Sequence, residues 1–277
     1  MISSSSTRQI LFSALPTTAF RSLSTSSSSS PSPPLSPELF EEAISEANLH
    51  ATLDRLKNIR LGGKLIPQKA GEKAASIFIP FTHHPLTSAP SILFTRRSFK
   101  LNKHRGEVCF PGGFEETADR GDLVEAAVRE TLEEIVGLRR EDITVVGTLP
   151  PIQFNTFPLH QVLGYVRISA EQWPLAVNED EVDSVHLVPL ETLVKAENWR
   201  RTVFSHGWTT PVFLDVTTSS GPLEDEERHP RIWGMTSSLL YVTMASLMPE
   251  SFHFDFEYLW RAKGLRRGVS SGEMRST

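Results

Sequence analysis

A group of acidic side chains at helical spacing is the feature that most constrains this chain of 277 residues. It lies in the run RETLEEIVGL at positions 129–138. On an α-helix, Glu130 and Glu134 are one turn apart and share a face, with Glu133 beside them. Carboxylates held this close repel one another, so a helix that groups them needs positive charge nearby. Mg²⁺, which prefers oxygen ligands, supplies that charge, and we therefore expect a metal-binding helix.

The residues around this group predict how the helix is held in place. The pattern predicts a helix from Asp122 to Val136, with Gly137 as its C-cap. Arg129 lies one turn before Glu133 and can hold a carboxylate in a fixed orientation. The opposite face carries apolar residues that can pack on a sheet: Val124, Ala127, Val128 and Ile135. The alternative is an acidic helix face that is simply exposed to solvent. The combination of a glycine turn, an Arg-Glu pair, a Glu-Glu pair and a glycine after the helix, all at the right spacing, disfavours this alternative.

The rest of the pattern predicts an α+β fold with a mixed β-sheet. Short apolar runs predict strands at 74–80, 91–95, 107–110, 144–147, 162–166, 182–189 and 212–215, the first of them ended by Pro80. Helical spacing predicts further helices at 37–60, 190–196 and 233–248. Strands and helices alternate without a strict βαβ rhythm, which indicates the α+β class.

Composition excludes several classes of protein. Hydrophobic residues make up 39% and charged residues 22%, which is usual for a globular chain, and no apolar run is long enough to span a bilayer. The one cysteine, Cys109, excludes an intramolecular disulfide. The formal net charge is −5, so we expect no nucleic-acid partner. The sequence leaves the oligomeric state open.

The N-terminal segment differs from the rest in composition. Residues 1–36 are rich in Ser and Pro, contain Arg8 and Arg21, and lack acidic residues. This is typical of a transit peptide, and we expect a location in the mitochondrial matrix. A disordered tail without a targeting function is the alternative, which leaves a peroxisomal or cytoplasmic location open. We expect a helix and loop at 37–71, the main domain at 72–262 and a flexible tail at 263–277.

Residues 113–138 resemble the Nudix box, Gly-x5-Glu-x7-Arg-Glu-U-x-Glu-Glu-x-Gly-U, in which U is apolar. The second half, from Arg129 onward, fits the pattern, with Thr131 at one apolar position. The first half departs from it, because Asp119 stands where Glu is expected and two extra residues precede Arg129. The resemblance implies the Nudix fold, a mixed β-sheet sandwiched between α-helices, and Mg²⁺ or Mn²⁺ as the cofactor. Its implied metal ligands are Glu130, Glu134 and Glu133.

The upstream sequence is similar to one branch of that family, the coenzyme A diphosphatases. Residues 93–113, LFTRRSFKLNKHRGEVCFPGG, resemble the signature of this branch, and Asp119 with its longer spacer is familiar there. Weaker similarity continues at 147–151, 178–182 and 232–236. The resemblance implies coenzyme A or acyl-coenzyme A as substrate, and hydrolysis of its diphosphate bond to 3′,5′-ADP and 4′-phosphopantetheine (or acyl-phosphopantetheine).

The expected site combines acidic and basic groups. Arg97 and Arg105 belong to a basic cluster at 96–105 and can clamp phosphate oxygens. Gly112 and Gly113 form a turn that lets the backbone approach a ligand closely. The catalytic residues are expected to be Glu133, Arg129 and Glu181. Either glutamate can be the base that accepts the proton of the attacking water, and the sequence leaves this choice open.

Three other functions stay open at this stage. The first is a Nudix hydrolase with another substrate, such as NADH, a dinucleotide or an oxidised nucleotide. The second is a catalytically silent Nudix domain that binds a ligand or a protein, although such a domain has no need of the carboxylate group. The third is RNA decapping, which the lack of an extended basic stripe or aromatic platform disfavours.

Overall fold

The computed structural model describes residues 36–57, 73–154, 157–203, 209–214, 230–249 and 252. They all belong to one unit of contacts, residues 35–277. The expected transit peptide, apart from Ser36, lies outside the described residues, and so does the expected tail at 263–277. In the described part of the chain, no helix has the length and apolar character needed to cross a membrane.

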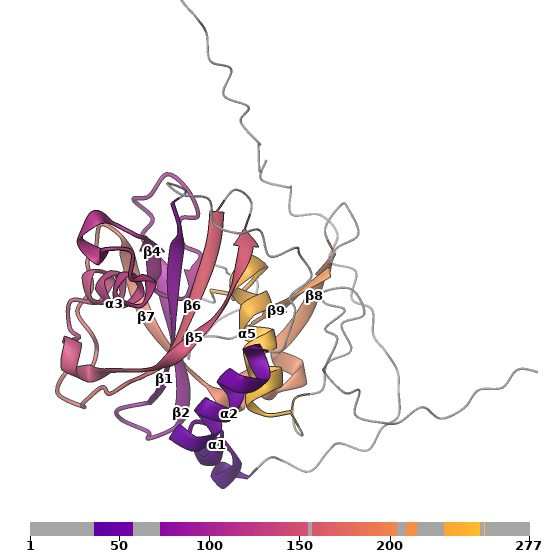
Figure 1. The fold of residues 1–277 in the computed structure, drawn as a ribbon. Helices are drawn as coiled ribbons and strands as arrows, with labels where there is room; N and C mark the ends of the chain where they lie inside the picture. Colours follow the sequence, from indigo (N-terminus) through magenta and orange to yellow (C-terminus); the bar gives the residue numbers. More distant parts are fainter. Residues whose placement is uncertain are drawn as a thin grey trace, which may run out of the picture. The chain divides into compact units, whose positions relative to one another are not determined.

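Seven strands of the described residues form one mixed sheet, in the order β3-β2-β1-β6-β5, with β4 also pairing with β1 and β7 with β2 (Figure 1). They are β1 (Ala75–His83), β2 (Pro90–Arg97), β3 (Val108–Cys109), β4 (Gly112–Phe114), β5 (Ile143–Phe154), β6 (Phe157–Val166) and β7 (Val182–Pro189). The β1–β6 pair is parallel and the other pairs are antiparallel. A separate two-stranded sheet joins β8 (Trp199–Val203) to β9 (Thr209–Phe213).

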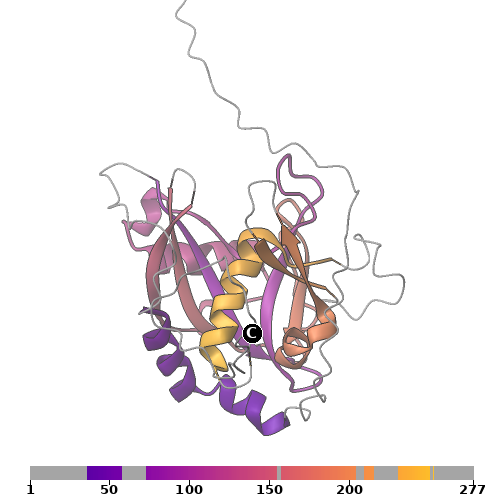
Figure 2. The same ribbon diagram turned by 90° about the vertical axis from the view of Figure 1, so that its right-hand side faces the viewer.

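Helices cover both faces of the large sheet, as expected for the α+β class. They are α1 (Pro37–Ala43), α2 (Glu46–Lys57), α3 (Leu123–Glu134), α4 (Leu190–Val194) and α5 (Gly234–Leu247). Figure 1 shows α3 on one side of the strands and α5 on the other, and Figure 2 shows α5 lying along its face of the sheet. The prediction of a mixed sheet between helices is therefore confirmed.

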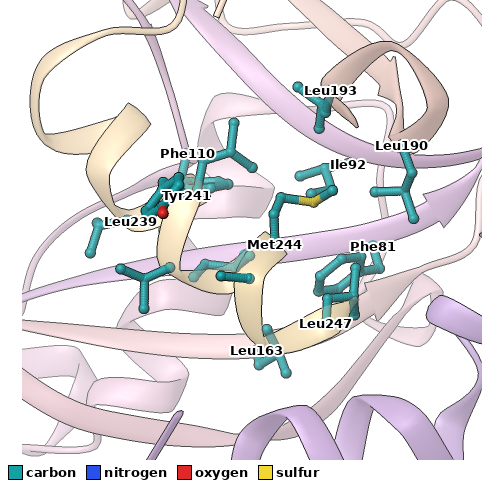
Figure 3. Close-up of a cluster of buried hydrophobic side chains, with 14 of the residues drawn as sticks. Phe81, Ile92, Phe110, Leu163, Leu190, Leu193, Leu239, Tyr241, Met244 and Leu247 are labelled. Atoms are coloured by element: carbon teal, nitrogen blue, oxygen red, sulfur yellow. The ribbon is translucent and has the colours of Figure 1, made fainter. Parts of the chain in front are cut away.

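Two hydrophobic clusters, one on each face, hold these layers together. In β1, Phe78 packs in the cluster with α3, whereas Ile79 and Phe81 pack in the cluster with α5. This alternation follows from the two-residue period of a strand. Figure 3 shows Met244 and Leu247 of α5 close to Phe81 from the sheet. The five longer strands of this sheet thus supply side chains to both layers, which fixes its register.

The middle of β1 corrects one prediction, because Pro80 does not end the strand. Residues 75–77 pair with β4 and residues 81–83 pair with β2, so Pro80 falls in the interval between these two partners. Proline lacks a backbone N–H, but at Pro80 neither β2 nor β4 pairs with β1, so no N–H is needed there for a hydrogen bond to these strands. The strand therefore continues to His83.

Other element boundaries differ from prediction as well. The expected helix at 37–60 is two helices, broken at Ile44 and Ser45, and residues 58–60 lie outside the described part. The short strands expected at 144–147 and 162–166 are parts of the longer β5–β6 hairpin. The expected strand at 107–110 is shorter, because β3 covers only residues 108 and 109, and the strand β4 at 112–114 was not expected. The helix expected at 233–248 is α5, within one residue at each end.

The N-terminal helices are attached to the C-terminal helix by polar contacts. Asn48 Nδ2 donates to the carbonyl of Leu247 at 3.0 Å, and Arg55 Nε donates to the carbonyl of Ser246 at 2.6 Å. These acceptors are carbonyls at the end of α5 that have no partner within the helix. The two contacts therefore cap α5 and hold α2 against it.

Candidate active site

Local sequence explains where α3 begins and ends. The Asp122 side chain accepts hydrogen bonds from the N–H groups of Val124 and Glu125, as an N-cap does. The helix ends at Glu134 and not at Val136, and Gly137 is not its C-cap. Gly137 instead donates its N–H to Ala176 at 3.0 Å, and a Cβ at this position would lie 2.9 Å from the Ala176 nitrogen. A close approach of two chain segments, and not a helix cap, requires this glycine.

Arg129 is the centre of a hydrogen-bond network beside α3. Its guanidinium donates to both carboxylate oxygens of Asp119 at 2.9 Å. It also donates to Glu130 at 3.1 Å, to Glu133 at 3.0 Å and to the carbonyl of Phe114 at 3.1 Å. The hydrogen bond from Arg129 holds the pKa of Asp119 below its ordinary value, and the same bond raises the pKa of Arg129. Arg129 therefore orients two of the expected functional carboxylates.

Asp119 is a residue of the site to which the sequence pattern gave no role. Its Oδ2 also accepts the N–H of Glu116 at 2.7 Å, which closes a 3₁₀ turn at Thr117–Asp119. Arg120 and Gly121 follow with φ of 54° and 80° and reverse the chain into α3. The extra residues of the altered box thus form a tight loop that delivers a short carboxylate to Arg129.

Glu134 is a buried carboxylate, and Glu130, one turn earlier on α3, is partly buried. Glu134 is only 3% exposed and accepts a hydrogen bond from Thr95 Oγ1 at 3.1 Å. Burial raises the pKa of Glu134 to about 7, against the opposing effects of Thr95, the Arg97 charge and the Gly112 N–H. Burial also raises the pKa of Glu130, and the nearby Arg129 opposes this rise. Removal from water without enough positive charge is the cause in both cases.

Gly112 and Gly113 begin strand β4 and do not form the expected turn, and Gly113 lies directly against Glu130. A Cβ on Gly113 would be 2.4 Å from the Glu130 carboxyl carbon, and a Cβ on Gly112 would be 2.3 Å from the carbonyl oxygen of Ser76. Gly112 also has a φ of 149°. Only glycine permits both approaches, so the backbone of β4 comes close to Glu130 at Gly113 and to β1 at Gly112.

The two expected phosphate-binding arginines differ in position. Arg97 ends β2, its charge acts on Glu134, and its Nε is buried without a hydrogen-bond partner among the described residues. Arg105 lies exposed in the loop 98–107, and within the described part of the chain it forms no ion pair. The structure thus brings Arg97 to the carboxylates and leaves Arg105 on the surface nearby. His104 in this loop pairs with Glu107 at 3.1 Å.

The two candidates for the base lie on different segments. Glu133 is half exposed and bound to Arg129. Glu181 is exposed, in a loop that is tied to α3 because Asn178 donates its N–H to the carbonyl of Glu134 at 3.0 Å. The charge of Glu181 contributes to the raised pKa of Glu130, which places it near the group. The choice between the two glutamates stays open.

The donor set is compatible with a hard divalent cation. Among the described residues, no three His, Cys, Asp or Glu side chains converge closely enough to form a complete metal site. Glu130, which is partly buried, and Glu134, which is buried, nevertheless offer carboxylate oxygens whose pKa values burial raises, so added positive charge would favour their ionised form. Mg²⁺ and Mn²⁺ suit such oxygen donors, and Mg²⁺ needs only one or two of them beside water and substrate phosphate. The residues present therefore fit the expected ion.

Comparisons with known proteins identify the family of this chain. The NUDIX domain family model matches residues 76–206. Nudix hydrolase 3 of Caenorhabditis elegans is 32% identical over 202 residues, which are 69% of this chain and 80% of the relative. Uncharacterized Nudix hydrolase NudL of Salmonella newport is 30% identical over 197 residues, which are 71% of this chain and 93% of the relative. The chain belongs to the Nudix hydrolase family.

A solved structure with a similar fold is the NUDIX domain of Shewanella oneidensis NrtR in complex with ADP ribose. It is 17% identical, with a TM-score of 0.34, and covers 44% of this chain and 75% of that chain. The family itself, shown by the sequence relatives, makes the protein a hydrolase of a nucleoside diphosphate derivative, and such hydrolases generally need a divalent metal ion. A catalytically silent domain is therefore set aside.

Proposed function

We propose that the protein hydrolyses the diphosphate bond of coenzyme A and its acyl derivatives. The observation that carries the proposal is the position of residues 93–113, which resemble the coenzyme A diphosphatase signature. This segment borders the carboxylates at three points: Thr95 binds Glu134, Arg97 acts on Glu134, and Gly113 touches Glu130. Residues that resemble a substrate signature thus form one wall of the site.

Charge in this wall supports a substrate with several phosphates. Coenzyme A carries a diphosphate and a separate 3′-phosphate. The Nε of Arg97 is buried and has no hydrogen-bond partner in the part of the chain that the structure describes, so it suits an oxygen of the diphosphate. Arg105 and Lys103 are exposed on the adjoining loop, where they can meet a further phosphate. A basic loop beside the site of a chain with a net charge of −5 favours a highly anionic ligand there.

The residues divide the work of hydrolysis among them. Glu130 and Glu134 would hold the metal ion, which when bound would neutralise phosphate charge and lower the pKa of a water. Glu133, the third expected ligand, is bound by Arg129 instead. Arg129 keeps Glu130 and Glu133 oriented. Arg97 holds the phosphoryl oxygens while a water oxygen bonds to phosphorus and the bridging P–O bond breaks. Glu133 or Glu181 accepts the proton of that water.

Mass spectrometry of the products tests this proposal. We expect incubation with coenzyme A and Mg²⁺ to yield 3′,5′-ADP and 4′-phosphopantetheine, and the Glu134→Gln variant to yield neither while remaining folded. A parallel panel with NADH, a diadenosine polyphosphate and 8-oxo-dGTP measures competing activities. Absence of phosphopantetheine, or faster turnover of another panel member, would reject coenzyme A as the substrate.

We also propose that the protein acts in the mitochondrial matrix. The support is the basic, acid-free composition of residues 1–36. Fusion of these residues to a fluorescent protein should direct it to mitochondria, and replacing Arg8 and Arg21 by Glu should prevent this. Cytoplasmic or peroxisomal fluorescence of the unmodified fusion would contradict the proposal.

A further inference from the structure

Phe114 is exposed to solvent and yet held in position. Its exposed fraction is 44%. Its backbone pairs with Ala75 of β1, and its carbonyl accepts a hydrogen bond from Arg129 at 3.1 Å. Its ring meets the Phe157 ring edge-on, with the centroids 4.9 Å apart. A ring fixed in this way offers an apolar surface that loses little freedom when a ligand covers it.

The other large apolar side chains that are exposed among the described residues lack this combination. They are Leu86, Phe99 and Val136. Phe99 already has internal partners, because Arg96 lies 4.7 Å over its ring and a Cβ on Gly106 would collide with it. Leu86 follows the last residue of β1, whereas β4 pairs with the first residues of that strand. Of these four side chains, only that of Phe114 belongs to a residue bonded to Arg129.

Phe114 lies next to the place where the diphosphate must react. The guanidinium that binds its carbonyl also binds Glu130 and Glu133. The preceding residue, Gly113, touches the Glu130 carboxylate. A diphosphate at these carboxylates has two substituents, and Phe114 is placed to contact one of them.

We propose that Phe114, supported by Phe157, stacks on the nucleobase of the substrate and is a specificity-determining residue of this enzyme. The inference rests on action upon a nucleoside diphosphate derivative and not on coenzyme A as the particular substrate. A planar base stacks on one aromatic ring without losing internal rotations, whereas a flexible tail loses several. A single supported ring therefore suits the base better than a pantetheine or acyl chain.

Binding of the two halves of the substrate tests this assignment. The full chain, with Mg²⁺, is titrated calorimetrically with ADP, with UDP and with 4′-phosphopantetheine. We expect Phe114→Ala to weaken ADP binding about fivefold to 150-fold, the range that loss of one stacked ring produces. Phe114→Leu keeps an apolar side chain but no ring, so it should weaken ADP binding less. Both variants should reduce the preference for ADP over UDP and leave phosphopantetheine binding unchanged.

Leu86→Ala serves as the control, because it removes an exposed apolar side chain from the turn that follows β1, whereas β4 pairs with the first residues of β1. It should leave all three affinities unchanged. Unchanged ADP affinity in both Phe114 variants would overturn the proposal, as would a loss confined to phosphopantetheine. If ADP binding depends on Phe114 but coenzyme A is not hydrolysed, the base assignment stands and the substrate proposal fails. If coenzyme A is hydrolysed but ADP binding does not depend on Phe114, the substrate proposal stands and the base assignment fails.

Discussion

At the scale of single residues, Arg129 and Asp119 show what a sequence pattern can and cannot provide. The spacing of Arg129, Glu130 and Glu133 follows from helical periodicity, so their grouping could be predicted. Asp119 lies ten positions before Arg129 in an irregular turn, and no periodicity relates the two. Its role depends on the 3₁₀ turn and on the positive φ of Arg120, which only the folded chain reveals.

Asp119→Asn is therefore expected to impair the enzyme without abolishing the fold. The variant loses the charged partner of Arg129, so the arginine no longer holds Glu130 and Glu133 in place. We expect activity to fall about 10- to 100-fold, as for other residues that orient ligands. The unfolding free energy should fall by roughly 2 kcal/mol, since a hydrogen bond to a charged group is weakened. Kinetics and urea denaturation measure the two effects.

Asp119→Glu is the matched control for that change. It keeps the negative charge and restores the residue that the general box has at this position. We expect it to retain more activity than Asp119→Asn. Equal activity of the wild type and Asp119→Asn would show that Arg129 needs no such partner.

Glu134 makes the stability of the metal-free protein depend on pH. Its pKa is about 7 in the folded chain, against an ordinary value of 4.5. Between these values the folded chain holds a proton that the unfolded chain has released, so the unfolding free energy falls as pH rises through this range. The total is roughly 3 kcal/mol, because one pKa unit corresponds to about 1.4 kcal/mol. A bound cation should reduce this loss.

Urea denaturation in EDTA at about pH 5 and about pH 8 brackets that range. The wild type should lose more stability between the two conditions than Glu134→Gln, which cannot ionise. Glu125→Gln, a change at an exposed glutamate of the same helix, should behave as the wild type does. The same pH dependence in wild type and Glu134→Gln would assign the titration to other groups.

At the scale of elements, the sequence predicted most of the helices and strands but few of their ends. The helix at Gly234–Leu247 was predicted within one residue because apolar residues recur along all of it. Pro80 and Gly137 misled the prediction, since each is a common terminator of local structure. Here Pro80 occupies an interval between strand partners, and Gly137 serves a contact with Ala176. Both roles depend on residues distant in sequence.

The contact between β4 and α3 predicts the effect of Gly113→Ala. The added Cβ must displace the Glu130 carboxylate, which is the end of a flexible side chain and can move at little cost to stability. A displacement of about 1 Å can lower a rate about 100-fold, so activity should fall by at least about tenfold. Enzyme kinetics and thermal denaturation on the same preparation test whether activity falls while stability is nearly unchanged.

Gly121→Ala is the control in the neighbouring loop. Its φ of 80° is unfavourable for alanine, but the new Cβ would meet nothing within 4 Å. We expect a loss of about 1 kcal/mol in stability and little change in activity. If Gly113→Ala also changed only stability, the Gly113–Glu130 contact would have no functional role.

At the scale of the whole molecule, the fold includes more than the matched family domain. The family model begins at residue 76, yet α1 and α2 contribute buried residues to the cluster beneath α5. Leu49, Leu53 and Leu56 are each 5% exposed or less. Helical periodicity predicted that this segment would be helical, but it could not show which face of the sheet the helices cover.

Two truncations test the contribution of these helices. Removal of residues 1–35 should leave activity and melting temperature unchanged. Removal of residues 1–57 exposes the apolar face that α2 covers, and each buried leucine contributes about 1.5–3 kcal/mol. Several such losses equal the whole stability of a typical domain, so the shorter chain should be insoluble or unfolded. A soluble, active chain beginning at residue 58 would contradict this.

The contact between Asn48 and Leu247 joins positions 199 residues apart. A chain is synthesised from its N-terminus, so α2 emerges long before the helix end that it caps. Until α5 has left the ribosome, α2 lacks one of its packing partners and the core on that face stays incomplete. The N-terminal segment is therefore presented on an incompletely folded chain throughout synthesis, which is the state that the proposed import into mitochondria requires.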